Sequence, residues 1–255
     1  MNKTKIEWLN GGYTWNPVTG CYHNCEYCYA RKIASRFVSD IRVDDISKII
    51  RKDMSVGPCI EMENRLGQYP HGFLPTFHRY RLDEPQKIKK PQNIFVCSMA
   101  DLFGDWIPDE WIQKVFEACE QAPQHRYFFL TKNPKRYYDL ELPIKDNFWF
   151  GTTLTTNCYM YYYSDVRNSF LSLEPLDTIY VPDINYLVDW VIMGAETGNR
   201  KNKVKPSKEI ISMNIDNCKL YNIPIFMKNN LKEIWGDELL QEFPFERSKD
   251  DTETA

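Results

Sequence analysis

Short apolar runs recur along the second half of this chain, and they constrain the fold more than any other feature. Each run is rich in aromatic or β-branched residues, ends in a polar residue, and precedes a stretch typical of a loop or helix. This pattern is typical of strands that are buried on both faces. The runs are NIFVCSMAD (93–101), RYFFLTK (126–132), NFWFGTTL (147–154), FLSLEP (170–175), DWVIMGAET (189–197) and IPIFMK (223–228).

Segments with helical spacing lie between several of these runs. Residues 107–123 place apolar side chains one helical turn apart, with prolines near both ends. Asn133 predicts the cap of a second helix, with Pro134 at its first position, and Ser207 predicts the cap of a third. Because strands and helices alternate, the sequence favours a parallel sheet with right-handed crossovers.

Two further strands are expected nearer the N-terminus, YTWNP (13–17) and the weaker FLPTFH (73–78), which gives about eight in all. We therefore predict a single α/β domain, a (β/α) TIM-like barrel, complete or partial. An open doubly wound sheet is the alternative. The barrel is expected to span residues 1–235 with an insertion at about 39–72, and residues 236–255 to form a polar C-terminal tail.

Composition and charge limit the setting in which the chain works. Its 255 residues are 43% apolar and carry a net charge of −3, so overall charge does not indicate a nucleic-acid or membrane partner. No run approaches the ~20 apolar residues that span a bilayer, and residues 1–12 lack a secretory signal. We expect a cytoplasmic protein with no membrane partner, in which eight cysteines indicate metal binding, catalysis or packing rather than disulfides.

Three of the cysteines, Cys21, Cys25 and Cys28, crowd into one short loop after the first predicted strand. Thiolates are ligands for zinc and for iron–sulfur clusters. A structural zinc ion needs four ligands, and the fourth would be His23 or a remote residue such as Cys97. A 4Fe–4S cluster also normally takes four cysteines, so three would leave one iron open to bind something else.

The spacing Cys-x3-Cys-x-aromatic-Cys, with Tyr27 at the aromatic position, resembles the signature of the radical S-adenosylmethionine (SAM) superfamily. This resemblance implies that Cys21, Cys25 and Cys28 hold a 4Fe–4S cluster and that SAM completes the open iron. It also implies that reductive cleavage of SAM yields a 5′-deoxyadenosyl radical, with an electron supplied by a flavodoxin or ferredoxin. The partial or full (β/α) barrel of that superfamily matches the fold predicted here.

Further blocks extend the resemblance from about residue 6 to residue 235. Together they are similar to a phage- and prokaryote-associated family of uncharacterised radical SAM-like proteins. The resemblance thus bears on fold and cofactor, and it implies no particular substrate. The blocks are TWNPVTGC, CxxCYA, RLDEPQK, FVCSMADLF, LTKNPKR, LSLEPL, VIMGAETG and PIFMK.

The chain departs from the superfamily at one element. The Gly-Gly-Glu element that holds the amino group of SAM after the second strand is missing there. The segment GAETG (194–198), near the seventh strand, has a similar composition. Its Gly194 would let the backbone approach a ligand, and Glu196 could pair with an ammonium group.

Polar residues that close the predicted strands are the other candidates for the site, because the carboxyl ends of barrel strands meet at one mouth. For each of them, the alternative is that the residue is polar only because it begins a solvent-exposed loop. His78 is the histidine expected near this mouth, with a surface role as its alternative. The predicted residues are Lys132, Glu174 and Lys228 as catalytic; Tyr27, Ser98, Asp101, Thr153, Gly194 and Glu196 as cofactor-binding; and Cys21, Cys25 and Cys28 as metal ligands.

Three basic segments, 77–92, 130–138 and 198–208, adjoin predicted strand ends. Lysine and arginine contacts to phosphates, with aromatic stacking, are how single-stranded or flipped nucleotides are held. These segments therefore suggest a nucleic-acid substrate, in modification or lesion repair, with a solvated charged surface as the alternative. A non-enzymatic zinc or iron–sulfur protein that binds nucleic acid is the second hypothesis for the whole chain.

Overall fold

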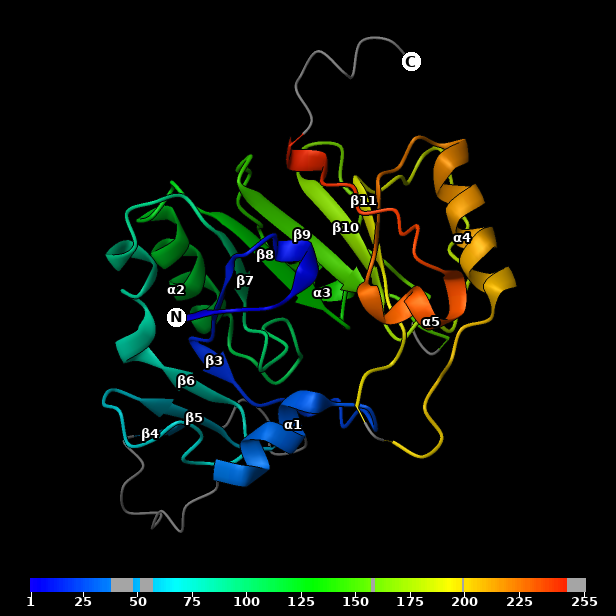
Figure 1. The fold of residues 1–255 in the computed structure, drawn as a ribbon. Helices are drawn as coiled ribbons and strands as arrows, with labels where there is room; N and C mark the ends of the chain where they lie inside the picture. The colour runs from blue at the N-terminus through cyan, green and yellow to red at the C-terminus, as the bar shows by residue number, and fades with distance from the viewer. Residues whose placement is uncertain (38–47, 51–56, 157–158, 199, 247–255) are drawn as a thin grey trace.

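Two β-sheets form the frame of the molecule (Figure 1). The computed structural model describes residues 1–37, 48–50, 57–156, 159–198 and 200–246. In the larger, eight-stranded sheet all neighbouring pairs are parallel except the edge pair β1–β2, which is antiparallel. In spatial order its strands are β1 (Asn2–Lys3), β2 (Tyr13–Trp15), β7 (Asn93–Val96), β8 (Arg126–Thr131), β9 (Phe148–Thr153), β10 (Asn168–Leu173), β11 (Trp190–Met193) and β12 (Ile225–Met227).

All the apolar runs predicted as strands between residues 90 and 230 form strands of this sheet, and YTWNP contributes β2. The sheet is open, however, with β1 and β12 at opposite edges of the described strands. Short segments occupy both edges: β1 pairs with β2, and residues 240–242 exchange backbone hydrogen bonds with Ile225 and Met227 of β12. The fold is therefore mixed α/β with a mainly parallel sheet, and a complete barrel is not observed.

A smaller, four-stranded sheet lies beside the first, and it takes the predicted strand FLPTFH. That segment was expected in the barrel but instead pairs with β3 and β5, because these two neighbours satisfy its backbone groups. Residues 48–50 and 59–62 of the predicted insertion supply two strands here, while 39–47 and 51–56 lie outside the described residues. The order is β3 (Val18–Thr19), β6 (Thr76–His78), β5 (Cys59–Met62) and β4 (Lys48–Ile50).

Helices α2 (Asp109–Glu120), α3 (Lys135–Asp139) and α4 (Lys208–Leu220) cover the outer face of the large sheet. The predicted helix within 107–123 is α2, and the cap predicted at Ser207 is confirmed, since its hydroxyl accepts the backbone N–H of Ile210 at 3.3 Å. Asn133 does not cap α3; its side chain donates to Phe103 and Asp105 instead. No helix of the described residues has the length and apolarity to cross a bilayer. The helices are α1 (Tyr29–Ala34), α2 (Asp109–Glu120), α3 (Lys135–Asp139), α4 (Lys208–Leu220) and α5 (Lys232–Trp235).

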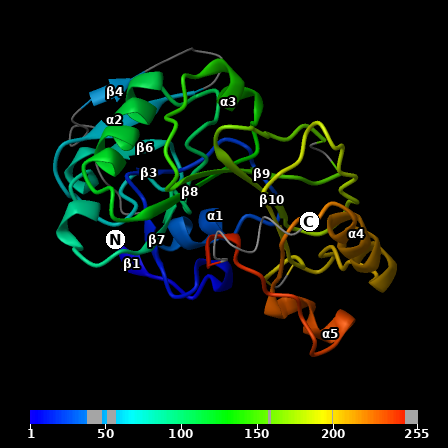
Figure 2. The same ribbon diagram turned by 90° about the horizontal axis from the view of Figure 1, so that it is seen from above.

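The inner face of the large sheet carries an aromatic core that chain segments cover. Every second strand residue points to this face, including Phe128, Trp149 and Trp190. Trp8, in a single-turn 3₁₀ helix, packs on Phe128 with ring centroids 5.6 Å apart, and Phe245 packs on Trp190 at 5.7 Å. Figure 2 shows the blue N-terminal and red C-terminal segments on the side of the sheet opposite α2 and α3.

These contacts change the interpretation of the C-terminal region. Residues 236–255 were predicted as a polar tail, yet Phe243 and Phe245 pack against the inner-face cluster. Their backbone continues the segment at residues 240–242 that borders β12, and a 3₁₀ helix follows at Pro244–Glu246. Up to Glu246, this segment is therefore part of the fold. The remainder, residues 247–255, lies outside the described residues.

Candidate functional site

A cavity of about 290 Å³ lies at the carboxyl ends of the parallel strands, above the aromatic inner face. The strand alternation explains its lining. Leu130 and Ser172 are pocket-facing strand residues, so the side chains two positions later, Lys132 and Glu174, reach the same pocket. Of the predicted site residues, these line it: Cys21, Cys25, Tyr27, Cys28, Ser98, Asp101, Lys132, Thr153, Glu174, Glu196 and Lys228.

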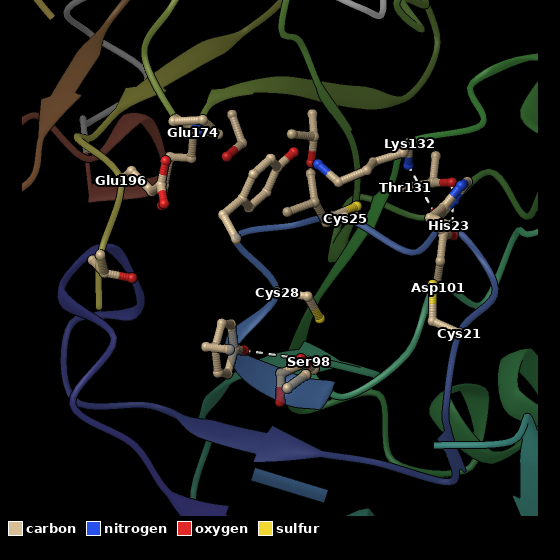
Figure 3. A pocket seen from close by; sticks show the side chains of 18 of the residues that line it. Cys21, His23, Cys25, Cys28, Ser98, Asp101, Thr131, Lys132, Glu174 and Glu196 are labelled. Carbon is tan, nitrogen blue, oxygen red and sulfur yellow. Dashed lines mark hydrogen bonds and ion pairs between the residues drawn. The ribbon is translucent and has the colours of Figure 1, made fainter. Parts of the chain in front are cut away.

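The cysteine loop forms one side of this pocket (Figure 3). Cys28 is the N-cap of α1, and its sulfur accepts the backbone N–H of Arg31 at 3.4 Å. Its own N–H donates to the carbonyl of Cys25 at 3.1 Å. Gly20 starts the loop with φ +88°, and a Cβ there would overlap the backbone of Leu74. Only glycine is therefore suited to this entry to the loop.

The three thiols share a pocket without converging on one point. In the described part of the chain, no three His, Cys, Asp or Glu side chains lie close enough together to hold a single metal ion. A cubane cluster binds each thiolate at a different iron, so its ligands need not converge in this way. Of the two residues that the sequence offered as a fourth zinc ligand, His23 lines the pocket and Cys97 does not.

The ionisation of Cys21 depends on what occupies the pocket. Burial, and then the negative charge of Asp101, raise the pKa of the Cys21 thiol to about 12. A thiol in this environment becomes a thiolate only when a cation compensates its charge. Without such a cation, Cys21 is therefore a neutral thiol rather than a nucleophilic thiolate.

Asp101 is held entirely by the protein. One carboxylate oxygen accepts the hydroxyl of Thr131 at 2.7 Å and the N–H of Phe103 at 3.0 Å. The other accepts the N–H of Lys132 at 2.8 Å and Nε2 of His23 at 2.7 Å. Burial opposes ionisation, but these hydrogen bonds, that of His23 first, hold the pKa of Asp101 below its usual range. Asp101, which was predicted to bind cofactor, lines the pocket and links the cysteine loop to β8 through these hydrogen bonds.

Three predicted residues line the pocket wall between the loop and the strands. The carbonyl of Ser98 accepts a hydrogen bond from the hydroxyl of Tyr29 at 2.9 Å. The side-chain hydroxyl of Ser98 donates to Oδ1 of Asn16 at 3.2 Å. Lys132 Nζ lies 5.4 Å from the ring centroid of Tyr27. Burial, and then proximity to Cys25, raise the pKa of the Tyr27 hydroxyl, so this ring is neutral.

On the opposite side of the pocket, Glu174 and Lys228 form an ion pair with 2.7 Å between Oε2 and Nζ. Burial acts against the charge of Lys228, but Glu174 outweighs it and raises the pKa of the ammonium. Gly194 does not line the pocket; it lies beneath this pair, where a Cβ would come 2.8 Å from Cδ of Lys228. Glycine at 194 therefore makes room for the pair, which is a different role from the ligand approach predicted for it.

Glu196, predicted to hold the amino group of SAM, has a protein partner on each oxygen. Arg200 donates from Nε to Oε1 at 2.8 Å and from Nη2 to Oε2 at 2.6 Å. Its third nitrogen reaches Glu26 of the cysteine loop at 3.0 Å. These bonds from Arg200 lower the pKa of Glu196. The Arg200 guanidinium thus bridges the two sides of the pocket mouth.

Several pocket residues were not predicted. Ile6 and Trp8 reach the pocket from the N-terminal segment, and Ser172 reaches it from β10. The alternation of FLSLEP could have predicted Ser172, since it stands two positions before Glu174. Arg200 stands four residues after Glu196 in a basic segment, a spacing that suits an ion pair. The N-terminal residues carry no periodicity that would have revealed them.

His78 is not at the mouth. It is fully buried in the smaller sheet, where Nε2 lies 2.9 Å from the hydroxyl of Thr19 and Nδ1 lies 3.2 Å from that of Tyr80. Burial, with the nearby Arg81 and His71, lowers the pKa of His78 to about 2. Neither the pocket nor the surface role predicted for this histidine is observed.

Several of the basic residues already have acidic partners. Arg136 pairs with Asp109, and Lys87 pairs with Asp83 at 2.8 Å. Of the three basic segments, 77–92, 130–138 and 198–208, the second contributes Lys132 to the pocket lining, and Lys228 lies outside all three.

Comparisons with known proteins place the chain in a family. Residues 3–237 match the model described as "Protein of unknown function (DUF5131)", and the chain belongs to this family. No curated protein matches the sequence. Among solved structures, a spore photoproduct lyase mutant with bound S-adenosylmethionine and dinucleoside spore photoproduct matches with a TM-score of 0.49 and 10% identity, over 84% of this chain and 75% of that one.

Proposed function

Because the chain belongs to a family of unknown function, we propose its activity from the site: a radical SAM enzyme that holds a 4Fe–4S cluster through Cys21, Cys25 and Cys28. The observation that carries the proposal is that these thiols, spaced as in the radical SAM signature, line one pocket with the charged ends of parallel strands. When bound, the cluster would supply an electron that cleaves SAM to a 5′-deoxyadenosyl radical.

The protein residues bind, orient and exclude water. Ile6, Trp8 and Leu130 give the pocket an apolar floor, which limits water near a reactive group. Glu174 and Lys228 offer one negative and one positive group at a fixed separation, suited to a ligand with both an acceptor and a donor. An electron donor such as flavodoxin or ferredoxin remains part of the proposal.

The substrate that we propose is a nucleic acid, in modification or lesion repair. Support comes from exposed lysines on the segment that follows Glu196: Lys201, Lys203 and Lys205. Lys132 and the ring of Tyr27 would supply a charge and a stacking surface inside the pocket.

The first test is anaerobic. The protein is reconstituted with iron and sulfide, reduced, and given SAM, and 5′-deoxyadenosine is quantified by mass spectrometry. We expect product from the wild type and none from Cys25→Ala. Cys218→Ala is the matched control, since Cys218 lies on the buried face of α4, outside the pocket, and its loss should leave the product unchanged. A fully loaded wild type that makes no 5′-deoxyadenosine, or a colourless protein with stoichiometric zinc, would contradict the proposal.

Oligonucleotide binding tests the proposed substrate. For a single strand, the slope of log K against log salt should fall by about 0.7 for each lost phosphate contact. We expect this fall in Lys201→Glu and Lys203→Glu. The control is Lys219→Glu, another exposed lysine, located on α4 outside the three basic segments. Equal slopes in all variants would exclude this surface as the contact.

A further inference from the structure

The turn between Cys21 and Cys25 packs against residues 100–106, which follow strand β7. Trp106 lies between two residues of the turn, with its ring 5.5 Å from that of Tyr22 and 4.9 Å from that of His23. Tyr22 also donates its hydroxyl to the carbonyl of Pro58 at 2.7 Å. The side chains between the two cysteines are therefore oriented by residues outside the loop.

The indole of Trp106 occupies its place because residue 104 is glycine. A Cβ at Gly104 would overlap the six-membered ring of Trp106. Trp106 itself is 6% exposed. This local arrangement gives a role to the end of the segment ADLFGDW (100–106), which begins within one of the sequence blocks.

Asp101, in the same segment, fixes His23 by a hydrogen bond of 2.7 Å. An ionised carboxylate only accepts, so Nε2 of His23 carries the proton. Asp101 is 5% exposed, and its three other donors, from Phe103, Thr131 and Lys132, hold the carboxylate in place without His23. The position of the carboxylate that accepts from His23 is thus set by residues outside the cysteine loop.

We propose that His23 is a positioning residue, which Asp101 and Trp106 hold so that the Cys21–Cys25 turn is shaped for a cluster before the cluster binds. The inference rests on the proposed function for its ligand. An unanchored turn would have to be ordered at the moment of binding, and that ordering weakens binding. Partners that orient metal ligands typically change metal affinity by about 10- to 100-fold when removed.

Two substitutions separate the hydrogen bond from the ring. His23→Phe keeps an aromatic ring for Trp106 and removes the donor to Asp101. His23→Gln removes the ring and keeps an N–H at the position of Nε2. The first readout is hydrogen exchange of residues 21–25 in the metal-free protein. We expect His23→Phe to raise the exchange rate about tenfold, since a hydrogen bond to a charged group is lost, and His23→Gln to stay near the wild type.

The second readout uses the reconstituted protein. We expect iron release to a chelator to be about tenfold faster in His23→Phe and restored in His23→Gln. The midpoint potential of the cluster should shift in the first variant and return in the second. Equal exchange and equal iron release in wild type and His23→Phe would overturn the inference, as would a His23→Gln variant that behaves like His23→Phe.

The two proposals can fail separately. A wild type that takes up no iron overturns the proposed function, and the assignment of His23 to cluster binding falls with it. A wild type that takes up iron, with the same release rate and potential in His23→Phe, overturns only the role of His23. Thermal unfolding of each metal-free variant shows whether a change is confined to the loop.

Discussion

The two sides of the pocket are built differently. On the cysteine side, residues 19–30, His23 donates a hydrogen bond to the buried carboxylate of Asp101. That carboxylate also accepts hydrogen bonds from Phe103 and, at the carboxyl end of β8, from Thr131 and Lys132. On the strand-end side, residues 172–174, 194–197 and 228, the polar contacts are ion pairs.

This difference has a physical consequence. A buried carboxylate with four donors cannot lose one without leaving polar groups unsatisfied, so the cysteine side is fixed before any ligand arrives. The Glu174 and Lys228 side chains are 23% and 18% exposed and line the open pocket, so a bound ligand would reach both charges. The cysteine side is suited to a resident group, and the strand-end side to molecules that come and go.

The largest effect is expected for Asp101→Ala. This change leaves the buried donors of Thr131, Phe103 and Lys132 without an acceptor. We therefore expect the free energy of unfolding, measured by urea titration, to fall by about 3 kcal/mol. Asp105→Ala is the control in the same loop: it is exposed, accepts from Asn133, and should change stability by about 0.5 kcal/mol. Similar losses in both variants would remove the contrast between the two sides.

The free energy of unfolding is expected to depend on pH through His78, which contacts Thr19 at the start of the cysteine side. His78 has a folded pKa of about 2, lowered by burial, against an ordinary value of 6.5, so it stays neutral in the fold and takes up a proton on unfolding. The contribution of neutral His78 to the free energy of unfolding is complete above pH 6.5. It declines as the pH falls below that value, by about 1 kcal/mol per pH unit. We expect His78→Gln to flatten the slope of unfolding free energy between pH 6 and pH 4. A slope equal to that of the wild type would show that His78 is accessible to protons in the fold.

A smaller effect is expected for Gly194→Ala on the strand-end side. The added methyl group meets Cδ of Lys228, a flexible side chain that can move away, so stability should fall by less than about 1 kcal/mol. Because the ion pair with Glu174 is displaced, 5′-deoxyadenosine formation should slow by about tenfold or more. Gly198→Ala is a control: no atom lies within 4 Å of its Cβ position, although its positive φ adds backbone strain. An unaffected rate in Gly194→Ala would mean that the position of Lys228 does not matter.

The smallest effect is expected for Arg200→Ala. Its bond to the exposed Glu26 is screened by solvent. The Glu196 side chain is 2% exposed but keeps the N–H of Val204 as a donor, so the free energy of unfolding should fall by much less than in Asp101→Ala. Affinity for SAM should become more sensitive to salt, because Glu196 is left free to pair with small ions. Arg200→Lys should recover only part of the wild-type behaviour, since a lysine cannot make the two-nitrogen contact. An unfolding midpoint as low as that of Asp101→Ala would contradict the proposed difference between the sides.

The sequence predicted strands β2 and β7–β12 of the large sheet because most of them are local apolar runs, whereas the polar edge strand β1 was not predicted. The same alternation placed Lys132, Glu174 and Lys228 in one pocket, since parallel strands present their carboxyl ends together. The openness of the sheet could not be predicted, because it depends on short edge segments such as residues 240–242, which have no strand pattern of their own.

The roles of individual site residues were harder to predict than their location. Asp101 was expected to contact a cofactor, and its use as a hydrogen-bond acceptor depends on Thr131 and Lys132, about thirty positions away. Gly194 was expected to admit a ligand, but the nearest side-chain atom belongs to Lys228 on another strand. Such roles depend on pairs of residues distant in sequence, which the pattern of a single segment does not contain.

The covering of the inner face by both end segments has a consequence for synthesis. Trp8 is synthesised before its partners Phe170 and Trp190, which follow it by 162 and 182 residues. Phe245 completes the same cluster and is made later still. The hydrophobic interior of this protein therefore stays unsealed during elongation, and the nascent chain needs shielding from aggregation until residues 243–245 have left the exit tunnel.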